Sequence, residues 1–180
     1  MLILRCTQKL LKKLDVPENQ LASDNAVSIS PLGNWHAHVI GVSRNHGVIF
    51  VNDATLFSFV VFNVSRATLK NELPAVFNSS FYDALLSEGF STEWIRKAKE
   101  VGGVFKVGRS TSRRVLGNIN DLIRHYQFYI LRDDGVEKCN MQKTIREMNR
   151  IPQKNLSWNY SIEAMKKLAN EPFREDLILH

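Results

Sequence analysis

The feature of this sequence that most restricts its fold is the order of two hydrophobic patterns along the chain. Strand-like runs of β-branched and aromatic residues are concentrated between residues 34 and 65, and helix-like spacing of apolar residues dominates from residue 65 onward. Two further short strands are indicated at residues 2–5 and 104–107. Because this order lacks the regular alternation of strand and helix found in doubly wound folds, the sequence predicts an α+β domain with a mostly antiparallel sheet packed against several helices.

A β-hairpin is predicted in the first half of the chain. The runs NWHAHVIGV, residues 34–42, and VIFVND, residues 48–53, flank a turn that contains Asn45 and Gly47. The next run, TLFSFVVFNV at residues 55–64, is apolar on both faces. Strands that read as continuous apolar runs are covered on both faces, so we expect this run to be a central strand of the sheet, with a buried helix as the alternative that periodicity alone leaves open.

Capping residues mark where several helices begin. Thr7 precedes an apolar stripe of helical spacing, and Ser65 and Ser91 precede two further helical segments. Pro74 suits the first turn of a helix, where a missing N–H group costs nothing. These signals predict side-chain caps at the three hydroxyl residues and a separate helix that starts at the proline.

The length of 180 residues suits one domain with a single core. The breaker Asp-Asp-Gly at residues 133–135 precedes two further helices, expected near residues 137–149 and 158–169. We therefore expect residues 1–132 to form an α+β core domain. Residues 133–180 are expected to form a helical C-terminal extension packed on the same domain.

Composition indicates a basic protein of a reducing compartment. The net charge of +6 favours polyanionic partners. Cys6 and Cys139 are isolated and lack metal-type spacing, which argues against a disulfide framework or a zinc cluster. The longest uncharged stretch, residues 54–65, is much shorter than a membrane span, and the residues before Arg5 are too few for a signal-peptide core. A cytoplasmic protein without membrane attachment is therefore expected.

The positive charge is concentrated in one segment, residues 96–114. It contains seven cations against one anion, Glu100, so its net charge equals that of the whole chain. The cations are Arg96, Lys97, Lys99, Lys106, Arg109, Arg113 and Arg114. Such a concentration predicts contacts with the phosphates of RNA or DNA.

An anion site is predicted where this basic segment enters a helix, within KVGRSTSRRVLGNINDL at residues 106–122. Free N–H groups and the helix dipole attract anions at a helix start, and serine and threonine hydroxyls add donors. Arginines in the first turn oppose the dipole by about 0.3–1 kcal/mol each, a conflict that a bound phosphate removes. A capped helix start with arginines extended into water is the alternative. The predicted anion-binding residues are Lys97, Lys99, Arg109, Ser110, Thr111, Ser112, Arg113 and Arg114.

A second face of the same helix carries the residues expected to support this site: Gly117, Asn120, Asp121 and Arg124. Glycine inside a helix costs about 0.5–1 kcal/mol relative to alanine. We therefore expect Gly117 to allow the close approach of a neighbouring backbone or of a ligand. Asp121 can orient Arg124, or the two can form an ordinary surface pair.

The hairpin supplies the candidate catalytic residues His36, His38 and Asp53. The two histidines project to the same face of their strand, because side chains alternate along it. Structural hydrogen bonding, general acid/base catalysis and metal ligation are the alternatives for them. Since no recognisable ligand set is completed, neither a metal nor another cofactor is expected. Asp53 follows the strand, where it can form a turn or lie opposite Arg113.

Four segments, MLILRCTQKLLKKL, LGNWHAHVIGV, VIFVNDATLFSFVV and RSTSRRVLGNINDL, occur in this order. With them the chain resembles a family of small bacterial proteins described as a domain of unknown function. The resemblance covers roughly residues 1–130 and implies no reaction, cofactor or catalytic residue. In the family the position of His36 can hold tyrosine, which argues against a role that needs both histidines. Arg113 matches the family pattern, and Arg114 departs from it.

Three functions compete on this evidence. The first is a binding module for nucleic-acid phosphates, with Trp94, Phe105 or Tyr126 available for stacking. The second is a small metal-independent ribonuclease of the toxin type, or another enzyme acting on a phosphoryl substrate. There a hairpin histidine would transfer protons, and Arg109 and Arg113 would stabilise the developing charge. The third is a protein-interaction or regulatory role. The sequence favours the first and leaves open whether the protein is an enzyme.

Overall fold

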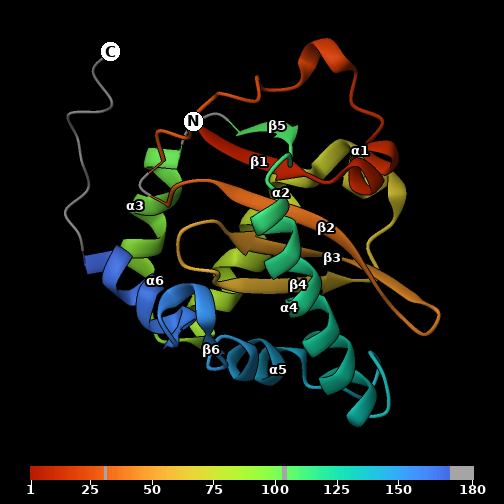
Figure 1. Ribbon diagram of the computed structural model, residues 1–180, viewed down its shortest axis with the longest axis vertical. Helices are drawn as coiled ribbons and strands as arrows, with labels where there is room; N and C mark the ends of the chain where they lie inside the picture. The colour runs from red at the N-terminus through yellow and green to blue at the C-terminus, as the bar shows by residue number, and fades with distance from the viewer. Residues whose placement is uncertain (31, 103–104, 171–180) are drawn as a thin grey trace.

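The computed structural model describes residues 1–30, 32–102 and 105–170, and of residues 99–102 only the backbone. A five-stranded sheet in the order β4-β3-β2-β1-β5 lies at its centre, with helices on both faces (Figure 1). The strands are β1 (Leu2–Cys6), β2 (Trp35–Val42), β3 (Asn45–Asn52), β4 (Ser58–Phe62) and β5 (Phe105–Arg109). The α+β architecture and the hairpin formed by β2 and β3 are therefore confirmed.

The sheet is antiparallel in its longest ladders and parallel around β1. Antiparallel pairing joins β2 to β3 and β3 to β4, whereas β1 pairs in parallel with β2 on one side and with β5 on the other. In this register Arg5 of β1 lies opposite His36 of β2 and Gly108 of β5. The carboxyl ends of β1 and β5 therefore lie next to each other, far apart as they are in the sequence.

The described residues form six α-helices around the sheet. They are α1 (Gln8–Leu14), α2 (Arg66–Ser87), α3 (Thr92–Gly102), α4 (Arg113–Arg132), α5 (Met141–Met148) and α6 (Ser161–Asn170). Two 3-10 turns, η1 (Glu18–Gln20) and η2 (Lys154–Leu156), and a short ladder of β6 (Pro152–Gln153) with β7 (Asn159–Tyr160) complete the description. Helix α4 crosses one face of the sheet and α2 covers the opposite face (Figure 1).

Aromatic packing fixes α2 on its face of the sheet. The ring of Trp35 on β2 lies 5.2 Å from that of Phe77 and 5.0 Å from that of Phe81, centroid to centroid, in edge-to-face arrangements. On the other face, Tyr126 of α4 is fully buried and hydrogen-bonded to Ser58 of β4. Because successive strand residues face opposite sides, Trp35 and His36 point to different layers.

Two of the three predicted side-chain caps are confirmed. Ser65 and Ser91 each accept a hydrogen bond from the backbone N–H three residues further on. Thr7 occupies the cap position of α1 without capping it, so that prediction is wrong. Its hydroxyl is instead hydrogen-bonded to Nδ1 of His38, 2.7 Å away, because the parallel pairing of β1 and β2 brings the two side chains together.

The two helical segments predicted around Pro74 form one kinked element, α2. Glu72, two residues before the proline, has non-helical backbone angles of φ −129° and ψ 20°. Proline lacks an N–H group and its ring clashes with the preceding turn, which accounts for the kink. The proline thus restarts the helix as predicted, without separating it from the first segment.

The prediction that residues 55–64 form a central strand is wrong, because β4 lies at the edge of the sheet. Both of its faces are nevertheless covered, since Phe59 packs against Phe77 of α2 and Ser58 meets Tyr126 of α4. The Asn149 side chain accepts from the backbone N–H of Ser58 and donates to its carbonyl oxygen, at 2.8 Å each. A side-chain amide therefore replaces the missing neighbouring strand at this point.

The chain after residue 132 packs against the rest of the molecule as far as the structure describes it. The buried residues of α5 include Ile145 and Met148, and those of α6 include Ile162 and Met165. The end of the predicted extension, residues 171–180, lies outside the described residues. No helix among those described is both long and apolar enough to cross a bilayer.

Candidate functional site

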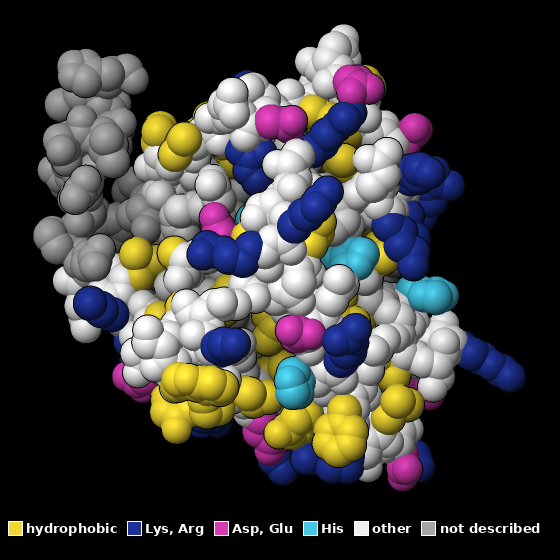
Figure 2. Space-filling view, viewed as in Figure 1, with side chains coloured by type: hydrophobic (Ala, Val, Ile, Leu, Met, Phe, Trp, Pro, Cys, Tyr) yellow, Lys and Arg dark blue, Asp and Glu magenta, His cyan; other side chains and the backbone are white. Residues whose placement is uncertain are grey.

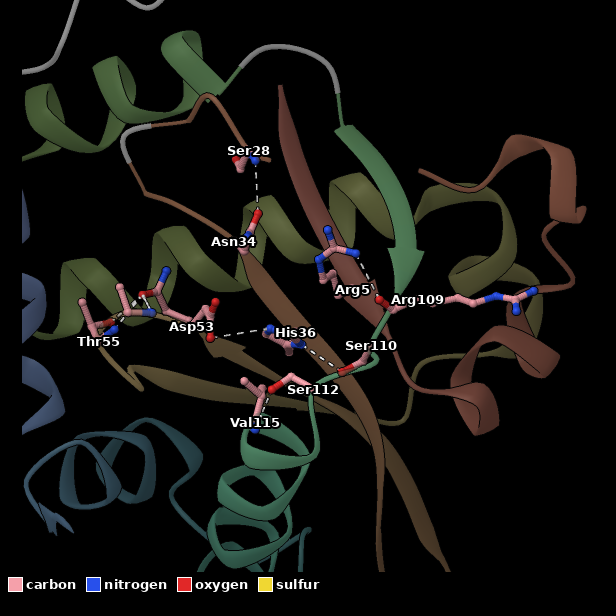
Figure 3. A network of polar contacts seen from close by, with 12 residues as sticks. Arg5, Ser28, Asn34, His36, Asp53, Thr55, Arg109, Ser110, Ser112 and Val115 are labelled. Carbon is pink, nitrogen blue, oxygen red and sulfur yellow. Dashed lines mark hydrogen bonds and ion pairs between the residues drawn. The ribbon is translucent and has the colours of Figure 1, made fainter. Parts of the chain in front are cut away.

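The predicted anion-binding hydroxyls lie in the short link between β5 and α4. The backbone N–H of Ser110 donates to the carbonyl of Cys6 at 3.0 Å, which continues the pairing of β5 with β1. At the other end of the link, Ser112 caps α4 by accepting from the N–H of Val115 at 3.4 Å. The link is therefore held at both ends, at the carboxyl edge of the two parallel strands (Figure 3).

Several backbone donors at this link have no acceptor among the described residues. No residue in the described part of the chain accepts a hydrogen bond from the N–H groups of residues 111–114. Such groups, at the positive end of the helix dipole, form a ready anion site. The sequence prediction of free donors at this helix start agrees with this geometry.

Ser110 is joined to the hairpin through His36. Nδ1 of His36 lies 3.0 Å from Oγ of Ser110, and Nε2 lies 3.8 Å from Oδ1 of Asp53 (Figure 3). The His36 side chain is 3% exposed, whereas the Asp53 side chain is 36% exposed. Burial lowers the pKa of His36 to about 4; Asp53 opposes this shift and Arg5 adds to it. His36 is consequently neutral at neutral pH.

Beside His36 lies a buried guanidinium without a carboxylate partner. Nη1 of Arg5 donates to the carbonyl of Arg109 at 3.2 Å, and Nη2 donates to the carbonyls of Asp24 and Ala26 at 2.9 and 2.6 Å. None of the described acidic side chains forms an ion pair with Arg5. Backbone dipoles alone support this charge, which leaves a positive potential close to the start of α4.

Arg113 and Arg114 extend from the first turn of α4 into solvent. No ion pair joins either of them to a side chain that the structure describes, Asp53 included. In the face seen in Figure 2, Lys and Arg side chains surround the region where α4 begins. Both arginines therefore stand at the helix end where cations are disfavoured, and both are free to meet an anion.

Two of the other cations predicted for the site, Arg109 and Lys97, lie elsewhere. Arg109 points away from Ser110 and His36 (Figure 3) and forms an ion pair with Glu18 of η1. This follows from strand alternation, because Gly108 shares the face of Arg5 and Arg109 takes the other. Lys97 pairs with Glu93 one turn earlier on α3, at 2.8 Å. The side chain of Lys99 lies outside the described residues.

The second hairpin histidine belongs to a different contact. His38 is half-buried and hydrogen-bonded to Thr7, and burial lowers its pKa, with a further contribution from Lys9. The structure thus brings His36, Asp53 and Ser110 together and leaves His38 beside the start of α1.

The expected supporting residues are exposed on α4. A Cβ atom at Gly117 would meet nothing within 4 Å, so the predicted close approach of a backbone is wrong. Asp121 accepts from Arg124 at 3.1 Å, with both side chains more than two-thirds exposed, as an ordinary surface pair. Asn120 is exposed as well. These residues lie further along the helix than the free N–H groups.

Sequence reasoning missed Arg5 as part of the site. The available signal was a cation inside the apolar strand LILRC, where a charge needs a specific partner. The site combines free backbone N–H donors, a buried guanidinium and a neutral imidazole, a set of groups that can hold an anion. Within the described part of the chain, no cluster of three or more His, Cys, Asp or Glu side chains could hold a metal ion.

Fold and site define a small α+β protein whose polar residues converge on the start of one helix. Residues 3–164 match the family described as a domain of unknown function (DUF6933), and the chain belongs to this family. The predicted family membership is confirmed, and the match continues past residue 130, through α5 and into α6. No match is found among curated proteins or among solved structures.

Proposed function

We propose that this protein binds phosphate groups of a nucleic acid at the amino end of α4. The observation that carries the proposal is the pairing of two features. The N–H groups of residues 111–114 have no acceptor among the described residues, and the buried, carboxylate-free guanidinium of Arg5 lies beside the same link. A bound anion would satisfy the donors and offset the buried charge.

Phosphate suits these donors better than a smaller anion. Its oxygens can accept from several N–H groups and from the hydroxyls of Ser110 and Thr111 at once. Arg113 and Arg114 would then contact the same or a neighbouring phosphate, which removes their conflict with the helix dipole. The net charge of +6 favours a ligand with many phosphates, as in RNA or DNA.

The experiment is fluorescence-anisotropy binding of labelled single-stranded RNA, duplex RNA and DNA at low and moderate salt. The double variant Arg113→Ala/Arg114→Ala is compared with Arg44→Ala/Arg146→Ala, which removes the same charge from exposed arginines in the β2–β3 turn and on α5. The first variant should lose affinity by about tenfold or more. The slope of log affinity against log salt concentration should become shallower, by the equivalent of about one to two released counterions. The control should change both quantities much less.

Equal losses in the two double variants would contradict the proposal, because binding would then follow net charge alone. Absence of binding by the unaltered protein at low salt would also contradict it. In that case a protein-interaction role would become the leading hypothesis.

A second candidate function, phosphoryl-transfer or ribonuclease chemistry, is favoured by the alignment of Asp53, His36 and Ser110. With the imidazole proton on Nε2, facing Asp53, Nδ1 can accept the proton of the Ser110 hydroxyl. Cleavage is tested by running the same RNA mixtures on a gel. An enzyme should lose cleavage with His36→Ala and retain binding, whereas His38→Ala should leave cleavage intact.

A further inference from the structure

Trp158 is exposed to an unusual degree for its type. Its exposed fraction is 67%, whereas Trp35 is fully buried and Trp94 is partly buried. Tyr160, two residues later, is 44% exposed. Single exposed apolar residues are common, so exposure alone implies no role. The backbone that carries Trp158 supplies the second observation.

The turn before β7 holds Trp158 in a strained conformation. Ser157 and Trp158 both have left-handed backbone angles, with φ of 55° and 66°. Side chains with a Cβ rarely adopt this region, and a bulky aromatic residue does so less often still. Local hydrogen bonds enforce the conformation, since the N–H of Ser157 donates to Lys154 and that of Trp158 donates to Gln153. Strain maintained in this way is concentrated at functional sites.

The turn is attached to α4, the helix whose amino end forms the proposed phosphate site. The Asn155 side chain donates a hydrogen bond to Oδ1 of Asn118 on α4. Asn118 lies one helical turn after Arg114, on the same face and about 6 Å further along the axis. Lys154, in the same turn, is exposed and forms no ion pair with any described residue. One unpaired cation, Lys154, therefore lies in the turn that carries Trp158, and this turn is tied to the helix that begins with Arg113 and Arg114.

We infer that Trp158 is a base-stacking residue, and that the nucleic acid bound at α4 is single-stranded. This inference rests on the proposed function. A basic track beside aromatic rings is the arrangement by which proteins hold single strands, since unpaired bases stack on the rings while cations follow the backbone. In a duplex the bases are stacked on one another, so Trp158 would find no free base. The strained turn keeps the ring exposed before any ligand arrives.

The test measures the affinity of Trp158→Ala, Trp158→Phe and Phe128→Ala for a labelled RNA dodecamer, single-stranded and as a duplex, at one fixed low salt concentration. Phe128 is the matched control because it is 65% exposed on the last turns of α4, away from the phosphate site. Trp158→Ala should weaken single-strand binding by about 5- to 150-fold. Trp158→Phe should weaken it less, and Phe128→Ala should not change it. The affinity for the duplex should be the same in the unaltered protein and in the three variants.

Salt dependence and fluorescence distinguish this inference from the proposed function. Trp158→Ala removes no charge, so its affinity should fall without a change in salt slope, unlike that of Arg113→Ala/Arg114→Ala. Single-stranded RNA should also quench tryptophan emission in the unaltered protein and fail to do so in Trp158→Phe. Unchanged affinity of Trp158→Ala, with loss in the double arginine variant, would overturn the stacking role and leave the phosphate site intact. Equal losses for single strand and duplex would likewise overturn it, and absence of all binding would refute the proposed function itself.

Discussion

Two arginines of this protein hold their charges in opposite ways. Arg150 donates two hydrogen bonds, at 2.8 and 2.6 Å, to the carboxylate of Glu88, whose side chain is completely buried. Arg5 is itself buried, and donates only to backbone carbonyls. The charges of Arg150 and Glu88 neutralise each other, and their contact ties the chain after α5 to the end of α2. The charge of Arg5 has no such partner and lies beside the free N–H groups of α4.

Comparison of Arg150 with Arg5 distinguishes a structural charge from one available to a ligand. A buried carboxylate that is paired and hydrogen-bonded by an arginine offers nothing to an incoming molecule, and the value of such a pair lies in holding two segments together. A buried cation supported by dipoles alone retains a field that attracts anions from solvent. Four measurements, in order of decreasing effect, test this difference between Arg150 and Arg5 and the properties of the site beside Arg5.

Breaking the ion pair between Arg150 and Glu88 should produce the largest loss of stability. Arg150→Ala leaves the Glu88 carboxylate buried without its partner, which should lower the free energy of unfolding by about 4 kcal/mol. Urea denaturation measures the effect. RNA affinity of the folded variant should be unchanged, and a loss of affinity comparable to that of Arg113→Ala/Arg114→Ala would show that the pair also serves the site.

The pH dependence of stability should report His36. Its pKa is lowered by burial from 6.5 to about 4, against the opposing effect of Asp53 and with the help of Arg5. Between these values the unfolded chain binds a proton that the folded protein lacks. The free energy of unfolding should therefore fall as pH falls from 6.5 to 4, by about 1.4 kcal/mol per pH unit. Above pH 6.5 His36 is neutral in both the folded and the unfolded state, so its full contribution to the free energy of unfolding should be present.

Denaturation at a series of pH values tests this expectation with two variants. His36→Asn should flatten the curve over that window. His125→Asn, which replaces an exposed histidine of α4, should leave it unchanged. A curve that is equally steep in His36→Asn would mean that other groups carry the pH dependence.

Removal of Arg5, the buried cation without a carboxylate partner, should have a smaller effect on stability. It should also shift the pKa of His36 specifically. Arg5→Met leaves three backbone carbonyls without their donor and should cost about 2 kcal/mol. Since Arg5 lowers the pKa of His36, its removal should raise that pKa, measured by NMR of the imidazole protons. Lys9→Met is the control, and should raise the pKa of His38 instead. No change at His36 in Arg5→Met would contradict the proposed field.

The smallest effect is expected at Gly117. Because a Cβ atom there meets nothing within 4 Å, Gly117→Ala should stabilise α4 by about 0.5–1 kcal/mol in thermal denaturation. Gly47→Ala should have the opposite sign, since its Cβ would lie 2.3 Å from the carbonyl oxygen of Val61. Retained RNA affinity in Gly117→Ala would show that the bound strand does not contact this face of the helix. A loss of affinity would show that the phosphate site extends along it.

Local signals predicted much of the fold. The hairpin, the long helix α4 and the caps at Ser65 and Ser91 follow from residue periodicity and from short-range hydrogen bonding, which need no distant partner. The edge position of β4 was not predictable in this way. A strand covered on both faces is apolar on both faces whether or not a neighbour pairs with it, and only Asn149, far along the chain, completes its edge.

The residues of the candidate site likewise fall into two groups, those predicted from local signals and those placed by contacts between distant segments. The hydroxyl link and the two first-turn arginines were predicted, because they occupy consecutive positions at one helix start, whereas Ser112 was not singled out as the cap. The direction of Arg109 was not, since a shift of one residue along a strand moves a side chain to the other face. The meeting of Ser110 with His36 depends on how β1 pairs with both of its neighbours.

The α+β class, the basic character of one segment and the helix start within it could be read from the amino-acid sequence. These properties depend on composition and on spacing within one element. The burial of Arg5 beside that helix start, and the exposure of Trp158 on a turn attached to the same helix, became visible only in the folded structure. Both depend on contacts between segments many residues apart, whose register follows from the packing of the whole sheet and its helices.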